Sequence, residues 1–136
     1  MRPPVLPVND NAVVAERVRL RVLAVDDNAM VAEEVAAMLS AAGLEVVGPA
    51  TTPEDALDFA LHAALDAAVL DVRLRDDTVF PVAKVLQVRR VPFMFLTGVW
   101  SAVLPVEFET VPLLAKPFRR QALQQGVWQL LAGPRA

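Results

Sequence analysis

The sequence predicts one α/β domain built on an open parallel sheet with helices on both faces. Short apolar runs alternate with segments of helical periodicity, and these runs are hydrophobic throughout rather than at every second residue. Strands that alternate with helices form right-handed βαβ units. The chain has 136 residues, of which 55% are hydrophobic, and this is the size of one domain.

Five apolar runs bounded by glycine, proline or aspartate are the predicted strands. They are residues 20–25 (LRVLAV), 44–50 (LEVVGPA), 66–72 (DAAVLDV), 91–98 (VPFMFLTG) and 111–116 (VPLLAK). Runs of this kind are typical of strands that pack against helices on both sides.

Helices are expected between these strands and after the last one. Apolar residues recur at helical spacing over residues 31–39, 80–86 and 123–131. A further helix begins near Thr52, because its hydroxyl can cap the helix and Pro53 suits the first helical position. Each predicted helix therefore connects two predicted strands or follows the last of them.

Composition excludes several classes of protein. The formal net charge is −3 and the basic residues are scattered, so a nucleic-acid partner is not expected. The chain has no cysteine and one histidine, His62, which we expect on the surface, so thiolate chemistry and histidine-rich metal sites are excluded. No apolar run reaches membrane-spanning length, and a cytoplasmic location without membrane contact is expected. Residues 1–18, which contain three prolines, are interpreted as an N-terminal extension, and residues 19–133 as the domain.

Polar residues gather where the predicted strands end. Asp26 and Asp27 follow the first strand, Asp71 lies near the end of the third, and Thr97 and Lys116 lie at the ends of the fourth and fifth. In open α/β sheets ligands bind at the carboxyl ends of the strands. We therefore expect these five side chains to converge at one edge of the sheet.

These residue types suit phosphoryl chemistry that depends on Mg²⁺. Crowded carboxylates repel one another unless a cation joins them, and Mg²⁺ prefers oxygen ligands from one or two carboxylates. A carboxylate beside the metal can attack phosphorus, while a lysine and a hydroxyl stabilise the transferring oxygens. The set predicts a site that can form an acyl phosphate.

Four motifs in this order resemble the receiver domains of two-component response regulators. They are VDDN (25–28), VLDV (69–72), FLTG (95–98) and AKPF (115–118). The resemblance covers about residues 20 to 132 and implies a flavodoxin-like sheet with strand order 2-1-3-4-5. The sequence looks most similar to receivers that stand alone, without an output domain.

The resemblance implies a role for each residue of the site. Asp71 would be the phosphoacceptor, and Thr97 and Lys116 would contact the phosphoryl group. Mg²⁺ would be held by Asp26, Asp27, Asp71 and the backbone carbonyl of Arg73. A sensor histidine kinase or a histidine phosphotransfer protein would supply the phosphoryl group, in a phosphorelay that ends in binding to an unidentified target protein or to a second copy as a homodimer. Such a protein catalyses only its own phosphorylation and dephosphorylation and is not otherwise an enzyme.

The sequence departs from the resemblance in three places. The segment after Asp71, RLRDDTVFPVAKVL, lacks the usual glycine. The connection after Thr97 has room for little more than a turn or two of helix, so we expect the fourth helix to be reduced or missing. Leu113 stands where the family has an aromatic switch residue. The apolar residues Trp100, Val103 and Leu104 of that connection are expected to pack on the core.

Alternative interpretations remain open at the level of sequence. Asp27 or Asn28 could simply cap the first helix, and the other site residues could be ordinary strand-end residues. A binding module that keeps the receiver fold without phosphate signalling is one alternative function. A Mg²⁺-dependent phosphohydrolase is another, although VDDN lacks the DxDx(T/V) spacing that such enzymes usually carry.

Overall fold

The structure is a computed structural model that describes residues 19–98 and 104–133. The N-terminal extension assigned to residues 1–18 lies outside these ranges, as do Trp100 and Val103. No helix in the described ranges is both long enough and apolar enough to cross a lipid bilayer.

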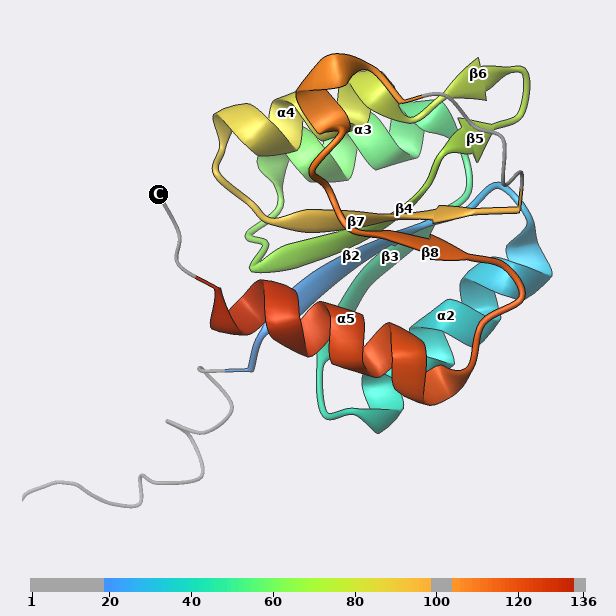
Figure 1. The fold of residues 1–136 in the computed structure, drawn as a ribbon, viewed down its shortest axis with the longest axis vertical. Helices are drawn as coiled ribbons and strands as arrows, with labels where there is room; N and C mark the ends of the chain where they lie inside the picture. The colour runs from blue at the N-terminus through green and yellow to red at the C-terminus, as the bar shows by residue number, and fades with distance from the viewer. Residues whose placement is uncertain (1–18, 99–103, 134–136) are drawn as a thin grey trace, which may run out of the picture.

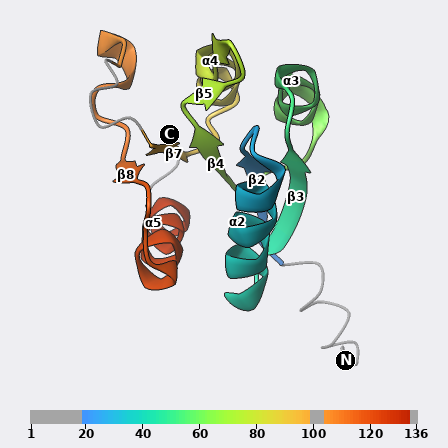
Figure 2. The same ribbon diagram turned by 90° about the vertical axis from the view of Figure 1, so that its right-hand side faces the viewer.

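Five strands form one parallel sheet in the order β3-β2-β4-β7-β8, which Figure 2 shows from β3 on the right to β8 on the left. Their bounds are β2 (Arg21–Val25), β3 (Glu45–Ala50), β4 (Ala67–Asp71), β7 (Phe93–Thr97) and β8 (Leu113–Ala115). Numbered along the chain, this is the expected order 2-1-3-4-5. The inner strands β4 and β7 are buried at every residue, which explains why their sequences are apolar on both faces.

Two pairs of helices cover the two faces of the sheet (Figure 1). The helices α2 (Ala29–Ala41) and α5 (Arg120–Ala132) pack on one face, and α3 (Pro53–His62) and α4 (Phe80–Val88) pack on the other. The predicted doubly wound α/β architecture is therefore confirmed.

Side chains named from the sequence begin two of these helices. The Thr52 side chain accepts a hydrogen bond from the Asp55 N–H at 3.1 Å, and Pro53 is the first residue of α3. The Asn28 side chain caps α2 by accepting from two backbone N–H groups, at 3.0 and 3.1 Å. Because Asn28 supplies the cap, the side chain of Asp27 is available for other contacts.

The connection between β7 and β8 contains, in its described part, the 3₁₀-helix η1 (Val106–Phe108) where a fourth α-helix was expected to be reduced or missing. Phe108 is fully buried and stacks on Phe80, with a centroid separation of 5.5 Å. Leu104 packs against the same core cluster, as expected. One aromatic side chain therefore anchors the short connection to the sheet.

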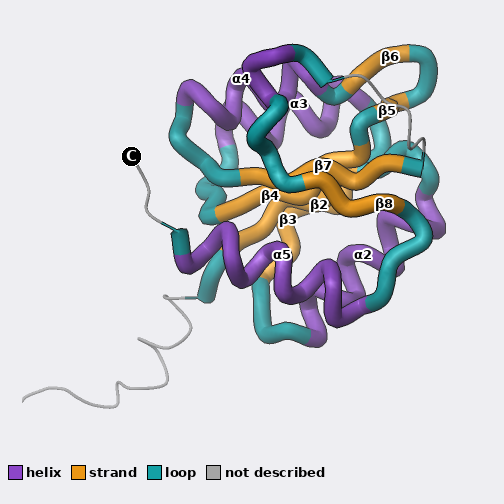
Figure 3. Tube along the Cα trace, in the orientation of Figure 1, coloured by secondary structure: helices purple, strands orange, loops and turns teal. Residues whose placement is uncertain are grey.

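A two-stranded hairpin, β5 (Arg73–Leu74) and β6 (Asp77–Thr78), follows β4 and lies beyond the carboxyl ends of the strands (Figure 3). The five strands predicted from the sequence do not include this hairpin. Leu74 is buried beneath the hairpin, whereas its two-residue turn, Arg75 and Asp76, is exposed. Arg75 has φ of 59°, a conformation that two-residue turns commonly require and that glycine adopts most easily.

Replacing Arg75 by glycine is expected to raise the free energy of unfolding by about 0.5–1 kcal/mol, because relief of the left-handed conformation exceeds the added entropy of the unfolded chain. Urea denaturation measures this change. Arg73→Gly, at an exposed strand position of the same hairpin, is the matched control and should lower stability. A loss of stability in both variants would contradict the expectation.

Candidate functional site

The ends of four neighbouring strands bring the predicted site residues together. Asp71 is the last residue of β4 and Thr97 is the last residue of β7, while Asp26 and Lys116 directly follow the last residues of β2 and β8. The N–H of Lys116 donates to the carbonyl of Thr97 at 2.8 Å. This hydrogen bond places the two residues side by side at the carboxyl ends of their strands. The expected convergence at one edge of the sheet is present.

Three carboxylates form a compact cluster at this edge. One oxygen from each of Asp26, Asp27 and Asp71 lies within 4.8 Å of the other two. Asp26 and Asp71 are buried, and Asp27 is partly exposed. Charges of one sign this close, two of them buried, need compensation by a cation or by a proton.

Lys116 supplies part of this compensation. Its Nζ donates to Asp26 Oδ2 at 2.6 Å and lies 3.5 Å from Asp71 Oδ2. One ammonium group against three carboxylates leaves an excess of negative charge. The excess favours either a second cation or a proton on one of the acids.

The excess of negative charge, together with burial, affects the protonation of the Asp71 carboxyl group. Its burial, followed by repulsion from Asp26 and Asp27, raises its pKa from 3.8 to about 6, and the attraction of Lys116 opposes the rise. Near neutral pH the group is ionised, but a small change in its surroundings changes its charge. A carboxylate at the mouth of a sheet with a raised pKa is typical of a functional site.

Replacing Lys116 by glutamine is expected to raise the pKa of Asp71 further, because the variant loses both the charge and the hydrogen bond that oppose protonation. The carbon-13 shift of the Asp71 carboxyl group, followed by NMR against pH in metal-free buffer, measures the change. Lys84→Gln removes an exposed lysine of α4 and is the control. An unchanged titration of Asp71 in the Lys116 variant would contradict the expectation.

The cluster fits a hard divalent cation. All of its donors are oxygen atoms, they come from three separate carboxylates, and their negative charge exceeds that of the single lysine partner. Mg²⁺ takes this kind of ligand set and keeps water or phosphate oxygens in its remaining positions. Arg73 opens the hairpin two residues after Asp71, and the role predicted for its carbonyl remains a prediction.

Asp27 also holds the hairpin to the cluster. Its Oδ2 accepts a hydrogen bond from the N–H of Arg75, in the turn of the hairpin, at 2.7 Å. The contact uses a backbone donor, so no residue type in the sequence indicates it. The same carboxylate thus belongs to the acidic cluster and fixes the loop above it.

The residues expected to surround a phosphoryl group differ in burial and in the space around them. Thr97 is buried, and a Cβ built on Gly98 would meet only the Lys116 side chain, at 4.0 Å, so this position is open. The bond from Lys116 to Pro117 is cis. Leu113 is 46% exposed at the position of the aromatic switch residue.

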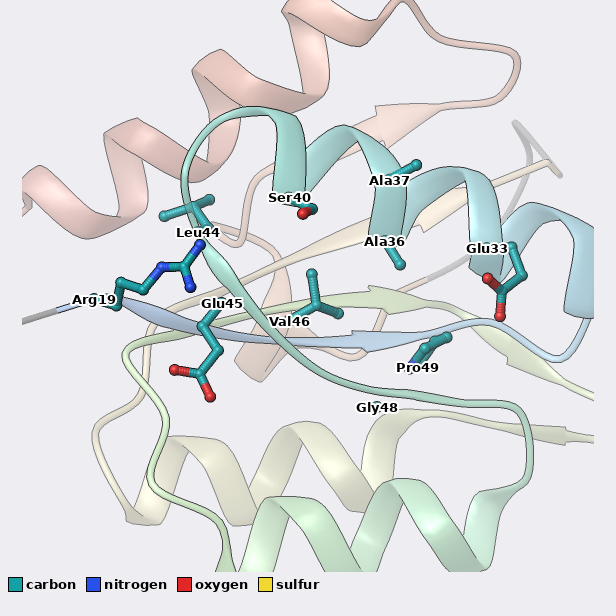
Figure 4. Close-up of a pocket in the computed structure, with 10 residues that line it drawn as sticks. All are labelled: Arg19, Glu33, Ala36, Ala37, Ser40, Leu44, Glu45, Val46, Gly48 and Pro49. Carbon is teal, nitrogen blue, oxygen red and sulfur yellow. The ribbon is translucent and has the colours of Figure 1, made fainter. Parts of the chain in front are cut away.

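A separate hollow of about 400 Å³ lies along α2 and the edge strand β3 (Figure 4). Its charged side chains, Arg19, Glu33 and Glu45, are spread over both ends of the hollow, and small residues line the middle. None of the predicted site residues lies in it. His62, on the other face, is exposed as expected and pairs with Asp58 at 3.1 Å.

Comparison with solved structures identifies the fold. The receiver domain of the hybrid histidine kinase CckA is 29% identical, with 82% of this chain and 98% of that chain covered and a TM-score of 0.67. The non-phosphorylated HemR receiver domain from Leptospira biflexa is 25% identical, with coverages of 87% and 98% and a TM-score of 0.73. This chain has the fold of a receiver domain.

A third receiver domain, from sensor histidine kinase PA1611 of Pseudomonas aeruginosa PAO1, holds a magnesium ion in its active-site cleft. It is 24% identical, with 85% of this chain and 100% of that chain covered and a TM-score of 0.73. No family model matches the sequence, and a search of curated proteins returns no match. The receiver resemblance drawn from the four motifs is confirmed, whereas the roles of the individual site residues remain predictions.

Proposed function

We propose that this receiver is a phosphorylation-dependent switch of a two-component system. The observation that carries the proposal is the cluster of Asp26, Asp27 and Asp71, with the Lys116 ammonium 3.5 Å from Asp71. The solved receivers from histidine kinases support a donor of the same class, a sensor histidine kinase or a histidine phosphotransfer protein. We place the protein in the cytoplasm, where such donors present their phosphohistidine.

Asp71 is the nucleophile in this proposal. One of its carboxylate oxygens forms a bond to phosphorus, the phosphorus–nitrogen bond to the donor histidine breaks, and the imidazole leaves with the electron pair and takes up a proton. Lys116 and the Thr97 hydroxyl stabilise the oxygens of the transferring group. The three carboxylates and the Arg73 carbonyl would hold Mg²⁺, which would supply neutralisation of negative charge on the same oxygens.

The product is an added dianionic group beside the half-buried Lys116, and this changes the balance of charge at the edge of the sheet. Asp26 and the phosphoryl group then compete for the ammonium group of Lys116. We propose that the resulting shift between two conformations is read by a target protein that binds the receiver, and that the chain catalyses no turnover reaction beyond its own phosphorylation and dephosphorylation.

An intact-mass measurement with Mg²⁺ and acetyl phosphate tests the phosphoacceptor. The wild type should gain one phosphoryl group, and Asp71→Asn or a chelator should abolish the gain. Asp77→Asn makes the same chemical change at an exposed acid of the hairpin and should leave the gain intact. Uptake by the Asp71 variant would contradict the assignment.

The exposed Leu113 favours a second candidate, a binding module that keeps the fold without phosphate signalling. Such a protein would take up no phosphoryl group, form no beryllofluoride complex with Mg²⁺, and bind its target equally with and without a phosphodonor. A beryllofluoride complex that forms without detectable phosphoprotein would instead indicate a switch that dephosphorylates itself quickly.

A further inference from the structure

One backbone hydrogen bond joins the hairpin after β4 to the carboxylate cluster. The N–H of Arg75, in the two-residue turn, donates to Asp27 Oδ2 at 2.7 Å. The hairpin lies beyond the carboxyl ends of the strands (Figure 3), and any residue except proline at this position would supply the donor. The turn therefore acts on the candidate cation site by a contact that does not depend on the side chain of Arg75.

The hairpin is anchored at both of its ends. Leu74 in its first strand and Val79 after its second are fully buried. The N–H of Val79 donates to the carbonyl of Val72 at 2.8 Å, and the two short strands pair with each other in antiparallel register. Because the hairpin is held on both sides of its turn, the direction of the Arg75 N–H is fixed relative to the sheet.

The two other carboxylates of the cluster also have oxygens that contact donors of the protein. Asp26 Oδ1 accepts from the Asn28 N–H at 2.9 Å, and Asp26 Oδ2 accepts from Lys116 Nζ at 2.6 Å. Asp71 Oδ2 lies 3.5 Å from the same Nζ. With the bond to Asp27, each carboxylate of the cluster has at least one oxygen beside a donor.

Cations differ in how many oxygens of one carboxylate they use. Mg²⁺ is small, requires a regular octahedron of ligands and fills it with water and single carboxylate oxygens. Ca²⁺ is larger, takes more oxygens and often binds both oxygens of one carboxylate. An oxygen that accepts a hydrogen bond uses one of its lone pairs for the donor. Binding of a cation through both oxygens then competes with that donor, whereas binding through the other oxygen does not.

The restraint on a carboxylate has its largest effect at Asp27. Asp26 and Asp71 are buried, so the surrounding side chains already limit their orientation. Asp27 is partly exposed, and its carboxylate turns at little cost unless a bond holds it. The Arg75 N–H supplies that bond, and a hydrogen bond to an ionised acceptor is among the stronger ones.

We propose that Arg75 is a positioning residue whose backbone N–H makes the site favour Mg²⁺ over Ca²⁺. Its bond to Oδ2 fixes the orientation of Asp27 and leaves the other oxygen of this carboxylate for a cation. Mg²⁺ requires no more than that oxygen, whereas Ca²⁺ gains the second one only at the expense of the bond. Since this cation is the one that the proposed function requires, the selectivity rests on that function.

Calorimetric titration of the full chain with Mg²⁺ alone and with Ca²⁺ alone tests the selectivity. In the test variant, made by semisynthesis, the α-hydroxy acid with the same side chain replaces Arg75, so that an ester oxygen stands in place of the N–H. The ratio of Mg²⁺ affinity to Ca²⁺ affinity should fall about tenfold, chiefly because Ca²⁺ binds more tightly. An ester that merely loosened the hairpin would weaken both cations alike and leave the ratio unchanged.

The same ester replacement at Asp76 is the matched control. Asp76 is the next residue of the exposed turn, and its ester should keep the wild-type ratio. NMR of the wild type adds a measurement that needs no variant. The amide proton of Arg75 should resonate downfield, as is usual for a short bond to a carboxylate, and should stay there on saturation with Mg²⁺. With Ca²⁺ it should move upfield, because the bond to Asp27 is lost.

Failure of the selectivity and failure of the proposed function give different results. An unchanged affinity ratio in the Arg75 ester, or loss of the downfield shift with Mg²⁺, would overturn the selectivity alone if the mass assay still shows phosphoryl uptake. A wild type that binds no Mg²⁺ would overturn both the selectivity and the cation assignment of the proposed function.

Discussion

Replacing Phe108 by alanine is expected to lower the free energy of unfolding by about 3–5 kcal/mol. The ring is fully buried, stacks on Phe80, and meets Phe93 and Phe95 edge-on with centroid separations of 6.1 and 5.7 Å. The variant leaves a cavity between α4 and the sheet and removes the anchor of the connection that leads to β8. Urea denaturation at equilibrium measures the change.

Val106→Ala is the control for this variant. Val106 lies in the same 3₁₀-helix but its side chain is 77% exposed, so the change should be within about 0.5 kcal/mol of zero. A similarly small effect at Phe108 would show that the connection does not contribute to the folded core.

The metal-free wild type is expected to lose stability as the pH rises from about 4 to about 6, and Asp71→Asn is expected to remove that loss. The pKa of Asp71 is raised from 3.8 to about 6 in the folded protein, so over this range the folded state keeps a proton that the unfolded state has released. Stability therefore falls with rising pH. The shift corresponds to about 2–3 kcal/mol in favour of the variant above pH 6.

Urea denaturation at a series of pH values, in the presence of chelator, measures this difference between wild type and variant. Saturating Mg²⁺ should stabilise the wild type more than the variant, because it neutralises the charge that burial makes unfavourable. Equal pH dependence in the two proteins would contradict the raised pKa. The exposed Asp77→Asn variant should follow the wild type.

Most of the sheet could be predicted because each strand is an uninterrupted apolar run. The runs predicted as 66–72 and 91–98 contain the buried strands Ala67–Asp71 and Phe93–Thr97, and the polar residues at their ends identified one edge as the candidate site. The cap at Thr52 was equally readable, since its hydroxyl and the following proline act locally. Contacts of this kind depend on neighbours in sequence, or on the parallel order of the strands.

Features that depend on tertiary position were missed. The hairpin after Asp71 has only two residues in each strand, too few for a periodic pattern, and its turn uses arginine where glycine is usual. Met30 is exposed although its side chain is apolar, because it lies in the first turn of α2 and the buried residues of that helix begin at Ala32. Phe108 carried no periodic signal in a three-residue helix, although it fills the core beneath α4.

The hydrogen bond from the Arg75 N–H to Asp27 gives the hairpin a thermodynamic connection to cation binding. A bond that persists when the carboxylates hold a cation restricts Asp27 and the turn together. Suppose that a target protein orders the hairpin when it binds. By linkage, the bound target then strengthens cation binding, and the bound cation strengthens target binding by the same factor. Cation affinity measured with and without a bound target therefore reports on the hairpin, even where the target touches none of the three carboxylates.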